Sequence, residues 1–190
     1  MVLEQAPARH AFSVEEWRRM AEAGLFQGDS HVELLDGEVF QMAAMGHPHY
    51  ACVLRLNHLL VNAVGDRALV SVQCPVQLDD YSEPEPDLAL VKHGLDSPDG
   101  HIAMASDVFL IIEVADSTLN WDVNYKAPRY ARAGVPQLWV VDVTAMEVRV
   151  FADPRPDGYA TTRRARRSDT LVVETLPGVA LNVDVLLGPA

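Results

Sequence analysis

The sequence predicts one α/β (α+β) domain that spans residues 1–190. Segments with a helical spacing of apolar residues alternate with apolar runs of strand length, which is typical of this class. The order strand, helix, strand over residues 108–143 predicts a parallel crossover. An Asp-Gly pair between two short runs predicts an antiparallel hairpin as well. No internal repeat or linker divides the chain, and its length suffices to bury a core.

Composition narrows the class of protein. Hydrophobic residues make up 49% of the chain and charged residues 22%, which is ordinary for a soluble globular protein. No apolar run is long enough to span a bilayer. Residues 1–12 lack the basic-then-apolar order of a secretory signal. We therefore expect a cytoplasmic protein that has no membrane partner.

The charge balance limits the kind of nucleic-acid surface that the protein can have. A net charge of −12 argues against a broad, non-specific surface, because phosphate binding is mainly electrostatic. One dense basic stretch, residues 161–167, leaves room for a local patch. Cys52 and Cys74 indicate neither a disulfide framework nor a metal cluster.

The first elements are a helix and a hairpin. Ser13 and Glu16 form a capping-box pattern, which predicts a short helix that ends near residue 23. A hairpin follows over residues 31–42, with its turn at Asp-Gly. Glu33 lies in its first strand beside apolar neighbours. Two interpretations stay open for Glu33, a carboxylate that faces a site and a solvated strand glutamate.

A second helix and a pair of short strands come next. Residues 47–64 carry an apolar stripe at helical spacing. His47 and His49 at its start have no third ligand at metal spacing, so a structural role is favoured for both. Two short strands follow between residues 68 and 78. The acidic loop 79–86 lacks the glycine and the final glutamate of a calcium loop, which favours a solvated charge run.

Two buried strands each carry an acidic residue at one end. Pro86-Asp87 opens the apolar run 87–91. Glu113 lies within 108–115, the most hydrophobic run of the chain, which predicts a central strand. A glutamate in such a run must be paired, metal-bound or protonated, because burying a free charge is costly. Glu113 is therefore the residue least easily explained by packing.

A helix between this strand and the next carries Lys126. Proline is tolerated in the first turn of a helix, so Pro128 predicts a start near Asn124, with Asn124 as the cap. Lys126 then lies in the first turn, close to the strand end that carries Glu113. Asp122 lies just ahead and could steer the lysine.

The last third of the chain predicts more strands and a closing helix. The crossover ends in a buried strand over residues 135–143, and a strand over 147–152 follows a tight turn. Residues 159–167 and 171–175 are expected to pair as a further hairpin, which Pro-Gly then breaks. A short helix over 183–187 closes the chain.

Asp87, Glu113 and Lys126 together suit the hydrolysis of a phosphodiester. A magnesium ion held by carboxylates activates a water and stabilises negative charge, and a nearby ammonium adds to that stabilisation. Asp87 and Glu113 would supply hard oxygen ligands from adjacent strands, and the carbonyl of Val114 could supply another. Lys126 would touch the attacking water or the scissile phosphate. A structural salt bridge among the same groups is the alternative.

Five motifs, in order, resemble the Uma-type (Uma two) family of putative restriction endonucleases, within the PD-(D/E)XK nuclease superfamily. The likeness runs from about residue 12 to residue 187. The motifs are Glu33-Leu34-Leu35-Asp36-Gly37, Pro86-Asp87-Leu88, Glu113-Val114-Ala115-Asp116-Ser117-Thr118, Asp122 with Lys126 and Tyr130, and Gly134-Val135-Pro136-Gln137-Leu138-Trp139-Val140-Val141-Asp142.

The resemblance implies a restriction-endonuclease-like mixed β-sheet flanked by helices, with a metal-dependent nuclease site. It makes Asp87 and Glu113 metal ligands and Lys126 the catalytic lysine, and it lets Glu33 complete the site. The chain departs from the superfamily pattern, since Ala115 stands where a lysine is usual. The resemblance accounts for this departure by a lysine displaced to the following helix, at Lys126.

We therefore expect an endonuclease that depends on Mg²⁺, or on Mn²⁺ in its place, and that acts on DNA. Arg129, Arg132, Arg163 and Arg164 are candidate contacts to backbone phosphates, and a solvated hairpin is the alternative for these arginines. A homodimer would suit the cleavage of both strands. The rival function is a non-catalytic scaffold or interaction module that keeps the fold, with its acids in salt bridges.

Overall fold

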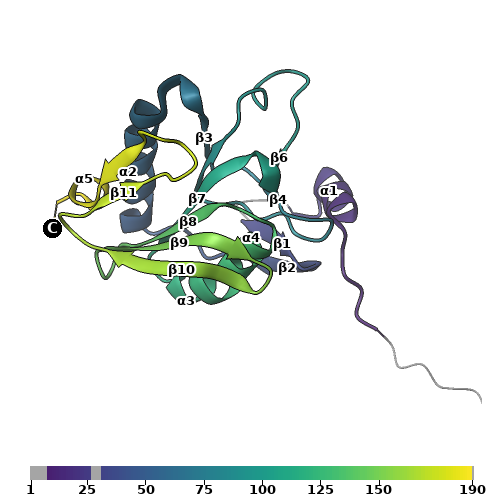
Figure 1. Ribbon diagram of the computed structural model, residues 1–190. Helices are drawn as coiled ribbons and strands as arrows, with labels where there is room; N and C mark the ends of the chain where they lie inside the picture. The colour runs from purple at the N-terminus through teal and green to yellow at the C-terminus, as the bar shows by residue number, and fades with distance from the viewer. Residues whose placement is uncertain (1–7, 27–30, 190) are drawn as a thin grey trace, which may run out of the picture.

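A six-stranded mixed sheet forms the centre of the molecule (Figure 1). The structure is a computed structural model that describes residues 8–26 and 31–189, so the stretch 1–12 considered above lies partly outside the described residues. The strand order is β10-β9-β8-β7-β5-β3, and β7 and β8 run parallel, which confirms the predicted crossover. The strands are β3 (Leu69–Val72), β5 (Leu88–Val91), β7 (Val108–Ala115), β8 (Gln137–Asp142), β9 (Glu147–Arg155) and β10 (Gly158–Ala165).

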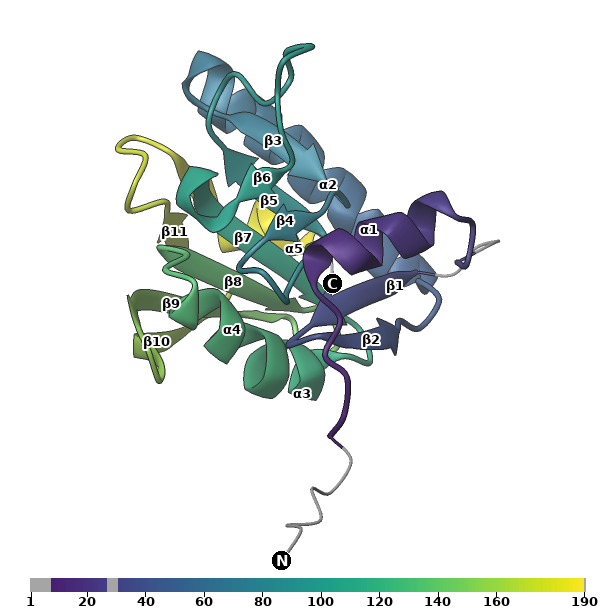
Figure 2. The same ribbon diagram turned by 90° about the vertical axis from the view of Figure 1, so that its right-hand side faces the viewer.

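Helices cover both faces of this sheet, as Figures 1 and 2 show. Alternate residues of β7 point to opposite faces: Leu110 and Ile112 pack on the side of α2, while Ile111 and Ala115 pack on the side of α4. Because β7 is covered on both sides, its sequence is a continuous apolar run. The covering elements are α2 (His47–Val64), α5 (Val183–Leu187) and the hairpin of β11 (Thr170–Val172) with β12 (Ala180–Asn182) on one face, and α4 (Ala127–Arg132) on the other.

The N-terminal helix and hairpin form where the sequence predicts them. The Ser13 hydroxyl accepts the Glu16 N–H at 3.2 Å, and the Glu16 carboxylate accepts the Ser13 N–H at 2.9 Å. The hairpin turn is Asp36-Gly37, with φ of 49° and 76°, as a two-residue turn of this kind requires. A Cβ at Gly37 would lie 2.6 Å from the Cβ of Ala11, so glycine is needed there. The bounds are α1 (Val14–Glu22), β1 (Val32–Leu35) and β2 (Glu38–Gln41).

Four short elements complete the fold. Strands β4 and β6 pair in parallel beside the main sheet, and two 3-10 turns link longer elements. In the part of the chain that the structure describes, no helix combines the length and apolar character needed to cross a membrane. The short elements are β4 (Val76–Gln77), β6 (Ala103–Met104), η1 (Gly65–Arg67) and η2 (Ala105–Asp107).

The predicted hairpin between residues 159–167 and 171–175 is wrong. Strand β10 instead pairs with β9, with Gly158 opposite Arg155 across a two-residue turn. Strand β11 pairs with β12. Strand β10 pairs with β9 because a two-residue connection joins antiparallel neighbours at the smallest cost in chain entropy. Since β10 is an exposed edge strand, its sequence carries no buried alternation that would identify its partner.

The predicted helix start at Asn124 is also wrong. The helical segment begins at Leu119, as α3 (Leu119–Trp121), continues as the π-helix η3 (Asp122–Lys126) and ends in α4. The Ala127 N–H bonds to the carbonyl of Asp122, five residues back. A wider turn directly before Pro128 accommodates a residue that has no N–H and would crowd the preceding turn of a regular α-helix. Lys126 therefore lies in the middle of the segment.

The acidic loop 79–86 is not merely a solvated charge run. Ser82 and Glu83 are buried, and the Glu83 N–H bonds to the carbonyl of Leu34 in β1 at 2.8 Å. Arg18 of α1 forms an ion pair with the Glu83 carboxylate. The loop thus fastens α1 to the hairpin, because a buried carboxylate needs a cationic partner.

Candidate active site

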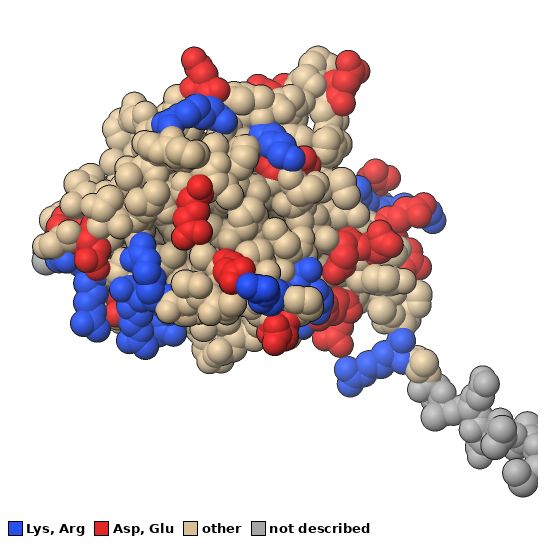
Figure 3. Space-filling view, viewed as in Figure 1, with Lys and Arg blue, Asp and Glu red and all other residues tan. Residues whose placement is uncertain are grey.

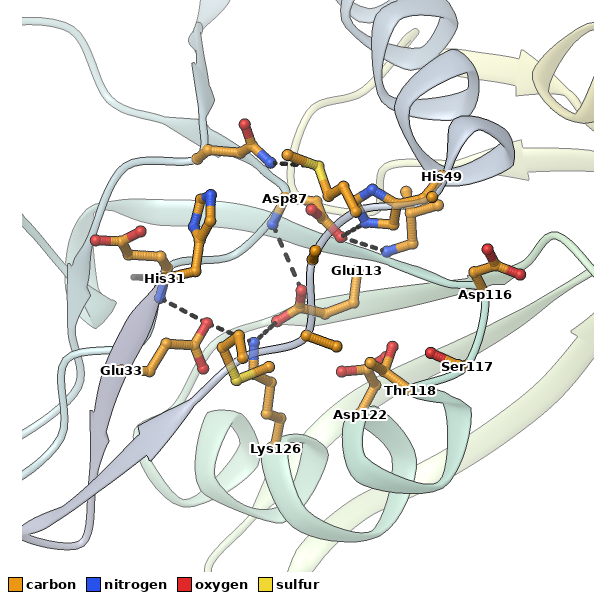
Figure 4. Close-up of a pocket in the computed structure, with 18 residues that line it drawn as sticks. His31, Glu33, His49, Asp87, Glu113, Asp116, Ser117, Thr118, Asp122 and Lys126 are labelled. Carbon is orange, nitrogen blue, oxygen red and sulfur yellow. Dashed lines mark hydrogen bonds and ion pairs between the residues drawn. The ribbon is translucent and has the colours of Figure 1, made fainter. Parts of the chain in front are cut away.

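A cavity of about 110 Å³ opens where the ends of β5 and β7 meet β1, the start of α2 and the segment α3–η3 (Figure 4). Its position follows from strand register, since Leu88 of β5 lies opposite Ile112 of β7 and brings the residues before and after them together. Six of the lining residues carry a carboxylate, whereas only one is a lysine and none is an arginine. The acidic side chains are Glu33, Glu85, Asp87, Glu113, Asp116 and Asp122.

Lys126 lies at the centre of a buried network. Its side chain is 3% exposed, and its ammonium donates to Glu33 Oε1 at 2.9 Å and to Glu113 Oε1 at 3.1 Å. The hydroxyl of Tyr130, one turn further along the helix, donates to the same Glu113 oxygen at 2.6 Å. The ammonium thus joins β1, β7 and its own helical segment, and Figure 4 draws its bonds to Glu33 and Glu113 as dashed lines.

Asp87 is held through one of its two oxygens. The Val114 N–H donates to Asp87 Oδ2 at 2.8 Å, and His49 Nε2 lies 2.9 Å from the same atom. The Asp87 N–H reaches Glu113 Oε2 at 3.4 Å, a long bond. Within the described residues, Asp87 Oδ1 accepts no hydrogen bond. This oxygen is therefore available to a ligand.

Burial and crowding of charge shift the pKa values in the cavity. Burial raises the pKa of Glu113 to about 8, against the attraction of Lys126, and it raises the pKa of Asp122 to about 6. Burial would lower the pKa of Lys126, but the carboxylates of Glu113 and Glu33 outweigh it and raise that pKa. The ammonium thus stays protonated at neutral pH. Negative charge exceeds positive charge here, and a further cation would relieve the excess.

The donor atoms of the cavity fit a hard divalent cation. Glu33 Oε2 is buried and has no hydrogen-bond partner among the described residues, and Asp87 Oδ1 is free. In the described ranges, no cluster of three or more His, Cys, Asp or Glu side chains could hold a metal alone. Mg²⁺ does not need one, because it commonly takes one or two protein carboxylates and keeps several waters. Asp87 and Glu113 are two such carboxylates, and their binding of the ion stays a prediction.

The structure brings the predicted catalytic residues together. Asp87, Glu113, Lys126 and Glu33 all line the one cavity, although they are far apart in the sequence. The two supporting residues, Asp122 and Val114, line it as well. Asp122 accepts a hydrogen bond from Thr118 at 2.6 Å and acts on Lys126 through its charge.

The four predicted phosphate-contacting arginines lie outside the cavity lining. Arg129 and Arg132 both donate to the carboxylate of Asp36 in the β1–β2 turn, a role that the sequence did not indicate. Arg163 and Arg164 are exposed on β10, where Figure 3 shows basic side chains gathered at the lower left. Arg164 pairs with a glutamate of β9 at 3.3 Å. Contact of these arginines with DNA stays a prediction.

Sequence reasoning missed the contribution of His49 and gave Tyr130 no role in the chemistry. His49 sits in the first turn of α2 and contacts Asp87, which lies 38 residues away in sequence. Its position at a helix start was the available signal, but the partner depends on how α2 packs against β5. Tyr130 follows Lys126 by one helical turn, so its place beside Glu113 could be inferred once Lys126 was placed there.

Comparisons with known proteins identify the family and the fold. A family model, Uma2, described as "Putative restriction endonuclease", matches residues 14–184. A solved crystal structure, described as a putative nuclease belonging to DUF820 from Anabaena variabilis ATCC 29413, matches with a TM-score of 0.73 and 16% identity. The match covers 93% of this chain and 97% of that one, so the two share a fold. A search of curated proteins finds no match.

Proposed function

Since this chain belongs to the Uma2 family, whose model is described as a putative restriction endonuclease, we propose that it is a metal-dependent endonuclease that hydrolyses phosphodiester bonds in DNA. One observation carries the proposal. Two carboxylates from adjacent strands and a buried ammonium, those of Asp87, Glu113 and Lys126, share one acidic cavity. The PD-(D/E)XK pattern, with its lysine displaced to the following helix, is the sequence counterpart of this arrangement.

Asp87 and Glu113 would hold Mg²⁺, with Mn²⁺ as a substitute, and the carbonyl of Val114 is a further candidate ligand. A divalent ion bound there lowers the pKa of a water and stabilises charge on the phosphate. The free Asp87 Oδ1 and the unpartnered Glu33 Oε2 support this assignment, because both are hard oxygen donors without a competing partner among the described residues.

Lys126 would act as a charged donor and not as a base. Its pKa is raised by Glu113 and Glu33, so it holds its proton at neutral pH. An ammonium has three N–H donors, and Glu33 and Glu113 take two of them. The third is available for a phosphate oxygen or for the attacking water. Charge stabilisation by a fixed donor in a dry site is a large contribution to such reactions.

The neighbouring residues fix the two acids in place. Val114 and His49 hold Asp87 Oδ2, so that Oδ1 is the free oxygen. Lys126 and Tyr130 hold Glu113 Oε1. Such outer contacts orient the ligands before the substrate arrives, which avoids the cost of ordering them during the reaction.

Cleavage of supercoiled plasmid tests the proposal. We expect nicking with Mg²⁺ or Mn²⁺ and none with a chelator. Asp87→Asn should abolish nicking, while Asp99→Asn, an exposed aspartate outside the cavity, should leave it unchanged. Nicking that persists in Asp87→Asn would indicate a contaminating nuclease or another site.

A scaffold function is the second candidate, because Lys126 already forms ion pairs with Glu33 and Glu113 without any ligand. A calorimetric Mn²⁺ titration separates the two. The nuclease needs a saturable site that Asp87→Asn removes. Heats that are negligible, or equal in the two proteins, would favour the scaffold.

The proposal extends to the partner, the oligomeric state, the location and the domain organisation. DNA is the partner that a phosphodiesterase site and the family description support. A homodimer would let two cavities act on two strands, and the mass in solution tests it. The cytoplasmic location and the single domain over residues 1–190 follow from composition and length, and both are proposals here.

A further inference from the structure

The outward face of α2 carries a stripe of apolar side chains that the described residues leave uncovered. Tyr50, Leu54 and Val61 are 53%, 51% and 52% exposed. Their separations of four and seven residues put them on one side of the helix, and Asn57 falls in the same stripe. The helix already buries its opposite side in the core. A spacing of four, three and four residues is the seam along which a second helix packs.

The charge of α2 restricts what can cover this stripe. The helix contains no Asp, Glu or Lys, and its one arginine, Arg55, donates inward to the carbonyls of Leu186 and Leu187. DNA and anionic lipid are bound mainly by Lys and Arg side chains, which this face does not offer. In a chain of net charge −12, an uncharged face is also where two copies approach with the least repulsion.

The stripe is self-complementary about its own midpoint. A two-fold axis perpendicular to α2, midway between residues 55 and 56, makes two antiparallel copies face each other. It places Tyr50 opposite the partner's Val61, and Leu54 opposite the partner's Asn57. Each contact is then made twice, as an isologous interface requires. A single polar residue in such a seam fixes register and orientation at some cost in stability.

We propose that the Tyr50–Leu54–Asn57–Val61 stripe of α2 is the interface of a homodimer of this chain. The proposal does not rest on nuclease activity, although α2 also carries His49, which contacts Asp87. A protein that dimerises but does not cut DNA would therefore overturn the nuclease alone.

Sedimentation velocity over a range of protein concentrations tests the interface. We expect the wild type to shift from monomer to dimer as its concentration rises. Leu54→Lys should weaken the dimer about tenfold or more, because it places a charge in an apolar seam twice per dimer. Leu25→Lys is the matched control, since Leu25 is 63% exposed and lies outside α2. It should leave the dissociation constant unchanged.

A second substitution tests the interface through an increase in the affinity of the dimer. Asn57→Leu should tighten the dimer, since it removes the polar residue from the seam. The melting temperature of each variant, measured at low concentration, separates loss of the dimer from loss of the fold. A wild type that stays monomeric at every concentration would overturn the proposal. So would a dimer that responds equally to Leu54→Lys and Leu25→Lys.

Discussion

Lys126 is a buried cation that two buried carboxylates need. Without it, Glu33 and Glu113 would share a site where burial already raises the pKa of Glu113 to about 8. We predict that Lys126→Met lowers the free energy of unfolding by about 3 kcal/mol at neutral pH, the usual cost of breaking a buried pair. Denaturant unfolding measures it, with Lys92→Met as the control, because Lys92 is half exposed.

The loss of stability in Lys126→Met should depend on pH in a definite direction. A carboxyl whose folded-state pKa is raised binds more protons in the folded protein than in the unfolded one. Stability then rises as the pH falls toward the unfolded-state value. The loss in Lys126→Met should therefore be smaller at acid pH than at pH 8, and a loss independent of pH would contradict this origin.

Substitution of His49 tests whether Asp87 must be held in position for the metal to bind. We predict that His49→Ala, in protein that is still folded, raises the Mn²⁺ concentration needed for half-maximal cleavage, because the His49 side chain fixes Asp87 Oδ2. His49→Gln, which keeps an N–H donor, should recover part of the affinity. His47→Ala is the control, since His47 is exposed on the same turn and lies outside the cavity lining. Equal effects at both positions would contradict a positioning role.

At the residue scale the sequence predicted the acids and the lysine but not what holds them. Glu113 could be identified because a glutamate within an apolar run needs a partner, whatever the fold. Asp87 could be identified because it opens the neighbouring strand. The His49–Asp87 contact could not, because it depends on the angle at which α2 packs on the sheet.

The β1–β2 hairpin is fastened to the helical segment by charge. Asp36 accepts from Arg129 and Arg132, and Arg129 lies 3.4 Å from the centre of the Tyr125 ring. Partial burial would raise the pKa of Asp36, but the hydrogen bond from Arg132 and the charges of both arginines outweigh it and hold the pKa below its usual range. Glu33 lies on this hairpin and Lys126 on the helical segment. The ion pairs of Asp36 therefore hold Glu33 and Lys126 in place relative to each other.

We predict that Asp36→Asn lowers the free energy of unfolding by less than about 1 kcal/mol at pH 7, because the pair is partly exposed. A carboxyl with a lowered folded-state pKa stabilises above its unfolded-state pKa, and this stability is lost as the pH falls through the folded-state value. The difference should thus shrink as the pH falls below the ordinary aspartate pKa of about 3.9 and through the lowered folded-state value. Asparagine tolerates the positive φ of this turn, so the variant tests charge alone. A difference that persists in acid would point to turn geometry instead.

At the element scale, local signals were predictive and long-range pairing was not. The capping box at Ser13 and the Asp-Gly turn each depend on residues that are close together in the sequence, and both form as predicted. The partner of β10 and the π-turn before Pro128 depend on competition between turns and on packing against β7. Proline alone suggested a helix start, whereas a widened turn satisfies the same constraint.

The whole molecule is acidic, and its arginines are largely engaged with its own carboxylates. Arg163 is an exception among the four predicted contacts, because it forms no ion pair within the described residues. We predict a shallow salt dependence of DNA binding, with a logarithmic slope of about −1 to −3. Arg163→Ala should reduce the magnitude of this slope by about 1. Arg19→Ala, on α1, is the control, and a slope unaffected by Arg163→Ala would contradict the predicted contact.

The mixed sheet flanked by helices was predictable at the scale of the whole molecule. Its central strand, Val108–Ala115, is apolar enough to require cover on both faces, and the crossover to Gln137–Asp142 sets a parallel pair. The cavity then follows, since the ends of adjacent strands meet at one edge of the sheet. The stripe on α2 was not predictable, because only the packed structure tells which apolar residues of a helix stay outside.

The most direct measurement is the single-turnover rate of plasmid cleavage at saturating Mn²⁺, compared between Lys126→Met and Lys92→Met. These are the only lysines of the chain, so the pair is matched. We predict that Lys126→Met, still folded by circular dichroism, cleaves about 100-fold more slowly or worse, as expected for the loss of a fixed charged donor. Lys92→Met should cleave at the wild-type rate. A folded Lys126→Met protein that cleaves as fast as the wild type would show that Lys126 has no part in the reaction.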